Sequence, residues 1–124
     1  MLFTTIEPVT LTLPYPPSVN NLYFTINNRR VLSKAGRNYK LTASAIASRA
    51  GLRPTFGAIA VYLKFYRPRK AGDLDNLLKA LLDSLKGIAW NDDSQVTEIH
   101  AERFEDKENP RAEIRIEKRE MTLV

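Results

Sequence analysis

The spacing of leucines predicts an amphipathic helix near the middle of the chain. Six leucines recur at i, i+3, i+4, i+7, i+8 and i+11, the spacing of a buried helical stripe: Leu74, Leu77, Leu78, Leu81, Leu82 and Leu85. Gly87 follows, and glycine readily adopts the left-handed conformation that ends a helix. The sequence therefore predicts a helix that starts just after Asp73 and buries its leucine face.

Alternation of apolar and polar residues predicts several strands around this helix. In the clearest strand, apolar residues occupy every second position and share one face. The predicted strands are Val9–Leu13, Gly57–Tyr66, Val96–Phe104 and Ala112–Ile116, the last of which pairs back after a polar turn over Asp106–Pro110. The charged residues 118–124 are expected to form a frayed tail.

A proline-rich segment and a small hairpin are predicted after the first strand. Pro14–Tyr23 contains three prolines, which remove backbone donors and are typical of a loop. Asn27 and Asn28 tolerate positive φ, so they are expected to turn a hairpin that presents Arg29 and Arg30 at its tip.

A second helix completes the predicted fold. Ser33 is a suitable N-cap, and apolar residues recur at helical spacing over Lys34–Ala50. The complete pattern predicts one α+β domain over residues 1–124. We expect a mixed β-sheet of about four to five strands packed with two main helices.

Composition excludes several kinds of site. The chain has no cysteine, which excludes thiolate zinc sites, cysteine nucleophiles and disulfides. His100 is its only histidine, so a histidine-based metal site or a Ser-His-Asp triad has little support, and we interpret His100 as an ordinary strand residue. No apolar run approaches the roughly 20 residues that span a bilayer, and no secretion signal is seen, so we expect a soluble cytoplasmic protein.

Positive charge is concentrated in the first half of the chain. Residues 1–70 carry eleven Lys or Arg and one acid, a net charge of +10, and the remainder carries −5. Such a surface attracts phosphate and binds nucleic acid without reading its sequence, although a surface tuned for solubility has the same charge. The candidate DNA-binding residues are Arg29, Arg30, Lys34, Arg37, Arg67, Arg69 and Lys70.

Acidic residues gather at both ends of the central helix. Asp75, Lys79 and Asp83 follow one another at i+4 steps beside the leucine stripe, so they line one edge of the helix. Single acids at such places are usually helix caps or turn residues. The combination favours a divalent cation, because magnesium prefers carboxylate oxygens. Further acids lie just before and after the helix: Asp73, Asp92 and Asp93.

In this segment the sequence resembles the RusA family of Holliday junction resolvases. The resemblance rests on DLDN at residues 73–76, on Lys79, on LLDSLKG, and on WNDDSQV at residues 90–96, with PYPPSVNNLY near the N-terminus. Ala71 and Gly72 replace what can be a continuous basic run in that family, and Asp92 precedes the matched acid.

The resemblance implies a small homodimeric endonuclease. It implies that magnesium, with manganese as a substitute, supports paired symmetric nicks in four-way DNA junctions. By position in the family motif, the catalytic and metal-binding acids would be Asp73, Asp75 and Asp93, with Lys79 in a supporting catalytic role. We expect the three acids to meet in one small volume, where a bound cation would offset their repulsion.

Two other functions are compatible with the same residues. One is a non-catalytic nucleic-acid-binding protein whose acids are caps and turn residues. The other is a metal-dependent nuclease that acts on another branched or single-stranded substrate. A phage or prophage origin is also compatible with a resolvase of this size, and the sequence does not indicate the cut-site preference or the number of metal ions.

Overall fold

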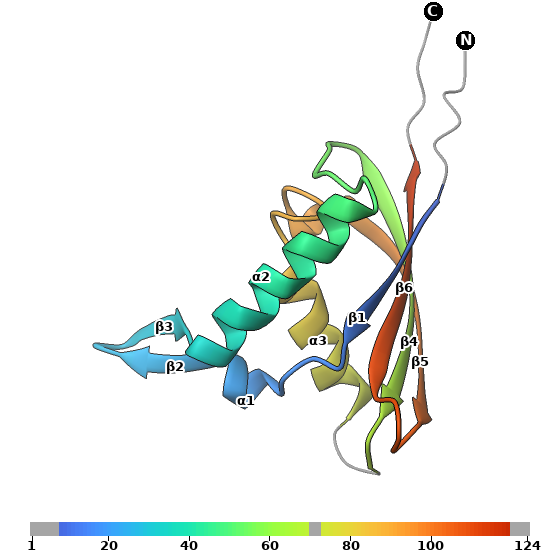
Figure 1. Cartoon of the computed structure of the whole chain (residues 1–124). Coiled ribbons are helices and arrows are strands. Elements are labelled where there is room, and N and C mark those ends of the chain that lie inside the picture. The colour runs from blue at the N-terminus through green and yellow to red at the C-terminus, as the bar shows by residue number, and fades with distance from the viewer. Residues whose placement is uncertain (1–7, 70–72, 120–124) are drawn as a thin grey trace, which may run out of the picture.

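The computed structural model describes residues 8–69 and 73–119, which form an α+β fold (Figure 1). The predicted mixed sheet and its two main helices are confirmed. The elements are β1 (Val9–Pro14), α1 (Val19–Leu22), β2 (Tyr23–Ile26), β3 (Arg29–Leu32), α2 (Lys34–Arg49), β4 (Ala58–Arg67), α3 (Leu74–Leu85), a 3-10 turn (Asp93–Gln95), β5 (Val96–Glu105) and β6 (Arg111–Arg119). None of the described helices has the length and hydrophobicity needed to span a membrane.

The main sheet has four strands in the order β1-β6-β4-β5. β4 runs parallel to β5 and antiparallel to β6, which in turn pairs antiparallel with β1. β4 takes the centre because it is the most apolar strand, with Ile59, Val61 and Phe65 almost fully buried.

The pairing of the last strand differs from the prediction. The turn over residues 106–110 was expected to join neighbouring strands, but β4 lies between β5 and β6. The backbone N–H of Asp106 donates to the carbonyl of Arg67 at 2.8 Å, so the turn passes around the end of β4. Because β5 and β6 do not pair with each other, the more apolar β4 lies between them and is buried inside the sheet.

One face of the main sheet is covered by α2 and α3 (Figure 1). Leu77, Leu81 and Leu85 of α3 are buried against it, and the remaining leucines of the stripe are partly buried, so the predicted helix is confirmed. Trp90, in the loop after α3, is fully buried in the same core. The helix and the residues after it are therefore held by one hydrophobic cluster.

The first half contains one element that was not predicted. The proline-rich loop includes α1, a single turn whose N-cap Ser18 accepts a hydrogen bond from the N–H of Asn21. The hairpin is confirmed as β2 and β3, with Asn27 and Asn28 at φ 51° and 60°.

The expected frayed tail begins later than predicted. Lys118 and Arg119 continue β6, where they pair with Ile59 and Ala58 of β4, so the expectation is wrong for these two residues. The other residues of that tail, 120–124, lie outside the described residues.

Gly36 allows α2 to pack closely against the base of the hairpin. A Cβ atom at this position would lie 2.6 Å from the carbonyl oxygen of Leu22 and 3.1 Å from the side chain of Leu32. The same junction is held by the N–H of Ser33, which donates to the Leu22 carbonyl at 2.7 Å. A side chain at position 36 would therefore push the hairpin away from α2.

We expect Gly36→Ala to destabilise the fold by about 1–3 kcal/mol, although alanine is the better helix former by about 1 kcal/mol. Urea unfolding measures this change, and Ser44→Ala, at an exposed position of α2, is the matched control and should change stability by less than about 0.5 kcal/mol. An increase in the stability of Gly36→Ala would contradict the close packing of α2 on the hairpin.

Candidate functional site

The edge of α3 borders a hollow that is lined by three acidic side chains. This acidic hollow has a volume of about 370 Å³ and lies between α3 and the start of β5. Because α3 buries its leucines, the residues at i+4 steps along its edge face this hollow. The lining residues are Asp75, Leu78, Lys79, Leu82, Asp83, Asp93, Val96 and Ile99.

Lys79 supplies the positive charge of the acidic hollow. Its Nζ atom lies 4.0 Å from Oδ2 of Asp83, one turn further along α3. The Lys79 side chain is 53% exposed and that of Asp83 24% exposed, so the pair is partly screened by water. The ammonium group is therefore free to contact a bound anion while Asp83 keeps it near the hollow.

Asp93 reaches the hollow from the loop after α3. The indole Nε1–H of buried Trp90 donates to Oδ1 of Asp93 at 3.0 Å. Trp90 is held in the core, so it fixes the position of one carboxylate oxygen. The Asp93 carboxylate is therefore held at the border of the hollow.

Gln95 holds the backbone of this loop. Its side-chain oxygen accepts the N–H groups of Asn91 and Asp92, each at 2.8 Å. Its amide nitrogen donates to the carbonyls of Thr55 at 2.5 Å and Gly57 at 3.0 Å. Four backbone groups thus depend on one amide, which ties the Asp93 loop to the segment before β4.

Asp92 belongs to the turn itself. Its carboxylate accepts a hydrogen bond from the Ser94 hydroxyl, and this bond is the main reason that the pKa of Asp92 is lowered. Asp92 is also the N-cap of the 3-10 turn, with Gln95 completing a capping box. The interpretation of an acid as a turn residue therefore applies to Asp92, whereas Asp93 faces the hollow.

Asp73 lies in a different hollow from Asp75 and Asp93. It occupies the N-cap position of α3, yet its carboxylate makes no capping hydrogen bond within the described part of the chain. It lines a hollow of about 420 Å³ on another face of the helix, together with Tyr15, Pro16, Ser18, Val19, Asn20, Asn21, Pro68, Arg69, Asn76 and Leu77. Simple capping does not account for Asp73.

The expected cradle of three acids is not formed. Within residues 8–69 and 73–119, no three Asp, Glu, His or Cys side chains lie close enough to hold one metal ion. Asp75 and Asp93 share a hollow, whereas Asp73 lines another. Asp73 is the N-cap of α3 and precedes Asp75 by two residues, so the two side chains leave the helix in different directions. The role of Asp73 as a metal ligand stays a prediction.

Tyr23 is a site residue that the sequence reasoning missed. Its hydroxyl donates to Oδ2 of Asp83 at 3.2 Å, from sixty positions away in the chain. Burial raises the pKa of Tyr23, and the Asp83 and Asp93 carboxylates raise it further, while Arg30 opposes them. The phenol therefore stays protonated at neutral pH and donates to Asp83. The i+4 spacing along the predicted helix pointed to Asp83, but no local pattern in the sequence links Asp83 to Tyr23.

The candidate DNA-binding residues fall into three groups. An exposed group lies on β3, on the start of α2 and beside Asp73: Arg29, Arg30, Lys34, Arg37 and Arg69. Arg67 differs from this group, because its side chain is only 9% exposed and its Nη2 lies 3.2 Å from Oε1 of Glu105 at the end of the sheet, so its role in DNA binding stays a prediction. Lys70 lies outside the described residues.

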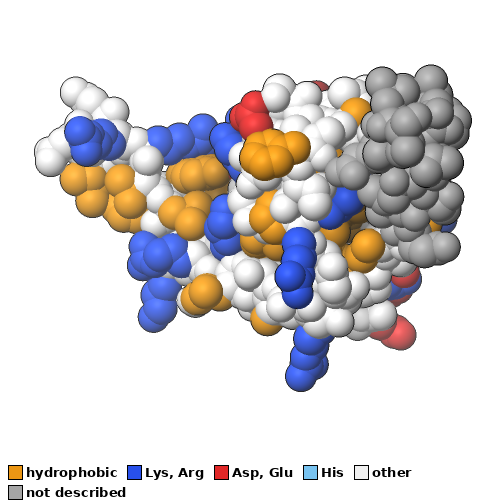
Figure 2. All heavy atoms as spheres, turned by 90° about the horizontal axis from the view of Figure 1, so that it is seen from above, with side chains coloured by type: hydrophobic (Ala, Val, Ile, Leu, Met, Phe, Trp, Pro, Cys, Tyr) orange, Lys and Arg blue, Asp and Glu red, His pale blue; other side chains and the backbone are white. Residues whose placement is uncertain are grey.

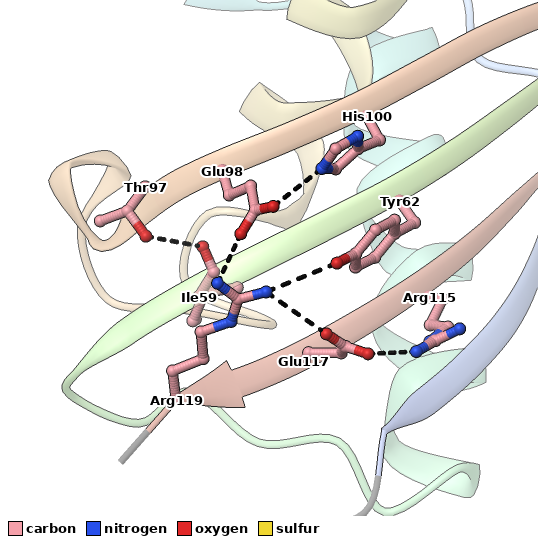
Figure 3. Close-up of polar contacts among 8 residues, drawn as sticks. All are labelled: Ile59, Tyr62, Thr97, Glu98, His100, Arg115, Glu117 and Arg119. Atoms are coloured by element: carbon pink, nitrogen blue, oxygen red, sulfur yellow. Dashed lines mark hydrogen bonds and ion pairs between the residues drawn. The ribbon is translucent and has the colours of Figure 1, made fainter. Parts of the chain in front are cut away.

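His100 lies on the face of the sheet turned away from α2 and α3 (Figure 3). Its Nε2 atom is 2.9 Å from Oε1 of Glu98, and its ring stacks on Tyr62 with centroids 4.8 Å apart. These contacts agree with its interpretation as an ordinary strand residue and place it away from the acidic hollow.

Comparison with known proteins matches most of the chain. The family model described as Endodeoxyribonuclease RusA matches residues 14–117. A protein of Shigella sonnei (strain Ss046) named crossover junction endodeoxyribonuclease RusA is 32% identical over 109 residues, 86% of this chain and 91% of that protein. The protein of that name in Escherichia coli (strain K12) gives the same values, and the one in Enterobacteria phage 82 is 31% identical over the same coverage. The family match includes both hollows.

Gln95→Glu tests the loop that presents Asp93. The change keeps the shape of the side chain but places a carboxylate against the carbonyls of Thr55 and Gly57, so we expect a loss of about 1–3 kcal/mol in stability. Trp90 is the only tryptophan, so its fluorescence during urea unfolding reports on this loop directly.

Asn91→Asp is the matched control, because it adds the same charge to the same loop without altering the Gln95 amide. We expect its stability to stay within about 0.5 kcal/mol of the parent. Equal stabilities for the two variants would mean that the Gln95 bonds do not hold the loop.

Proposed function

This chain belongs to the RusA family of endodeoxyribonucleases, and from that membership we propose that it resolves four-way DNA junctions by cutting two strands. The observation that best supports a catalytic role is that Asp75 and Asp93, eighteen positions apart, line one hollow. Their carboxylates come from a rigid helix and from a loop held by Trp90 and Gln95. Such support is typical of groups that must keep their position during catalysis.

The donor set of the hollow fits magnesium, with manganese as a substitute. Magnesium in phosphoryl-transfer sites is bound by one or two carboxylates, with waters and substrate phosphate completing its shell. Asp75 and Asp93 would supply these carboxylates, and Asp73 would add a third if it turned from its own hollow, which would break no capping bond. When bound, the ion polarises the phosphate and lowers the pKa of a bound water.

Lys79 acts on the charge that develops during hydrolysis. As the phosphodiester bond is cut, negative charge builds up on the phosphate oxygens, and a fixed cation stabilises it. The exposed Lys79 ammonium borders the same hollow as Asp75 and Asp93. Asp83 keeps this ammonium in place, and Tyr23 in turn orients Asp83.

The exposed basic side chains would hold the DNA backbone around this site. They lie on the hairpin and the start of α2, and Arg69 lies beside Asp73. Each phosphate contact releases counterions, so binding should weaken as salt rises. These exposed side chains belong to the half of the chain that carries the net charge of +10, and we assign DNA binding to them.

We also infer that the active form is a homodimer. A four-way junction has approximate twofold symmetry, and an isologous dimer presents two identical sites related by the same symmetry. Each copy would contribute one acidic hollow, so that the two cuts fall on opposite strands.

The two alternative functions differ from this proposal in measurable ways. A non-catalytic binding protein would use Asp73 as a helix cap, and the absence of a capping bond in the described residues argues against that role. A nuclease for another substrate would share the acidic hollow but would not prefer a four-way junction. Cleavage of a junction, a replication fork and a linear duplex separates these cases.

We expect the protein to nick a four-way junction in magnesium and to spare linear duplex. Asp75→Asn should reduce the nicking rate by at least about 100-fold. Loss of a group that only supports a metal ligand already lowers metal affinity or activity by about 10- to 100-fold, and Asp75 is proposed as a ligand itself. Junction binding by this variant should be unchanged or tighter, because one negative charge near the phosphates is removed.

Glu102→Gln is the control for this experiment. It removes the same charge from an exposed position on the outer face of the sheet, so nicking should stay at the parent rate. Nicking by Asp75→Asn at the parent rate would rule out the assigned acid, and equal cutting of linear duplex would favour the broader nuclease.

A further inference from the structure

A hairpin projects from the body of the protein beyond α1 and the start of α2 (Figure 1). We call residues 23–32 the hairpin arm; its strands β2 and β3 pair with each other in a separate two-stranded sheet. Its base is fixed to the body through the bond from Ser33 to Leu22 and the close packing at Gly36. A two-stranded hairpin has too few contacts to bury an apolar face by itself.

One face of the hairpin arm is apolar and open. Phe24 and Ile26 lie two positions apart on β2, so they share a face, and Val31 pairs opposite Phe24. Phe24 is 42% exposed and Ile26 is 50% exposed. Exposed apolar residues that cluster on a projecting element indicate a binding surface.

The charge around the arm favours DNA as the partner over a second copy of the chain. Arg29 and Arg30 follow the turn, and no acid occurs anywhere between residues 8 and 72. Hydrophobic and basic side chains lie together over the projecting part of the molecule in Figure 2. Two such arms would repel each other, whereas DNA offers both a negative backbone and the flat apolar faces of its bases.

The hairpin arm is also connected to the acidic hollow. Tyr23, its first residue, donates to Asp83, and Arg30 lies over the Tyr23 ring with 4.1 Å between its Cζ atom and the ring centroid. The four residues of β2 extend about 10 Å from that bond, which is about three base-pair steps. A phosphate at the acidic hollow would therefore place the arm a few bases away.

We propose that the hairpin arm is a wedge that presses Phe24 and Ile26 against the base pair at the branch point of the junction. This inference rests on the proposed function and adds to it the element that recognises branching. Apolar side chains that enter between bases unstack them and distort the helix. A branch point already interrupts base stacking, so the wedge acts there at lower cost than in continuous duplex.

The test uses a four-way junction with 2-aminopurine in the base pair next to the branch point. With EDTA present, so that no cutting occurs, binding of the parent protein raises 2-aminopurine fluorescence because the base unstacks. In the double variant Phe24→Ala/Ile26→Ala we expect this rise to be lost. Affinity for the junction should fall about 10-fold, the scale of one lost base–aromatic stack, while affinity for linear duplex stays within about twofold.

Two further variants separate this role from a loss of folding. Phe56→Ala removes another exposed phenylalanine, 79% exposed and outside the arm, and should keep both the fluorescence rise and the affinity. Phe24→Tyr keeps an aromatic ring on the apolar face of the arm and should also keep the rise in fluorescence. Urea unfolding of all variants shows whether the fold is retained.

A fluorescence rise that survives in the folded double variant would overturn the wedge. The wedge would also be overturned if analytical ultracentrifugation showed that the parent protein is a dimer and the double variant a monomer. That result would mean that the arm makes contacts between copies of the chain. Failure of the proposed function has a different signature, because the parent protein would then unstack the junction in EDTA but produce no nicks in magnesium.

Discussion

The burial of one face of α3 against the central sheet is the interaction on which the acidic hollow depends. Leu81 and Leu85 are completely buried and share a core with Phe65 of β4. Removal of one such leucine typically costs about 2–5 kcal/mol, so the rotation of α3 about its axis is strongly determined. Once the leucines are buried, Asp75, Lys79 and Asp83 must lie along the exposed edge.

The Asp93 side of the hollow is held in place by side-chain hydrogen bonds. Asp93 lies on a loop, where a carboxylate would normally be mobile. The indole of Trp90 extends the core to this carboxylate, and the Gln95 amide joins the loop to the residues before β4. In the segment WNDDSQV, Trp90 thus anchors the loop in the core, Asp92 caps the turn, and Asp93 faces the hollow.

The sequence predicted the features that depend on local spacing. The leucine stripe identified α3, and alternation identified β4, because burial on one face imposes the period of each element. Features that depend on distant contacts were missed: β4 lies between β5 and β6, Arg67 pairs with Glu105, and Tyr23 bonds to Asp83. The acids were found by motif, but only the packing of α3 shows that Asp73 faces another hollow than Asp75.

Titration of the protein with manganese, in the absence of DNA, tests the central claim that Asp75 and Asp93 act together as a cation site. Calorimetry should detect binding by the parent protein, and Trp90 fluorescence should change with it because the indole bonds to Asp93. Asp75→Asn and Asp93→Asn should each weaken binding by at least about 10-fold, with Glu102→Gln as the unaffected control. Equal manganese affinity in all four proteins, with no change in Trp90 fluorescence, would contradict this account.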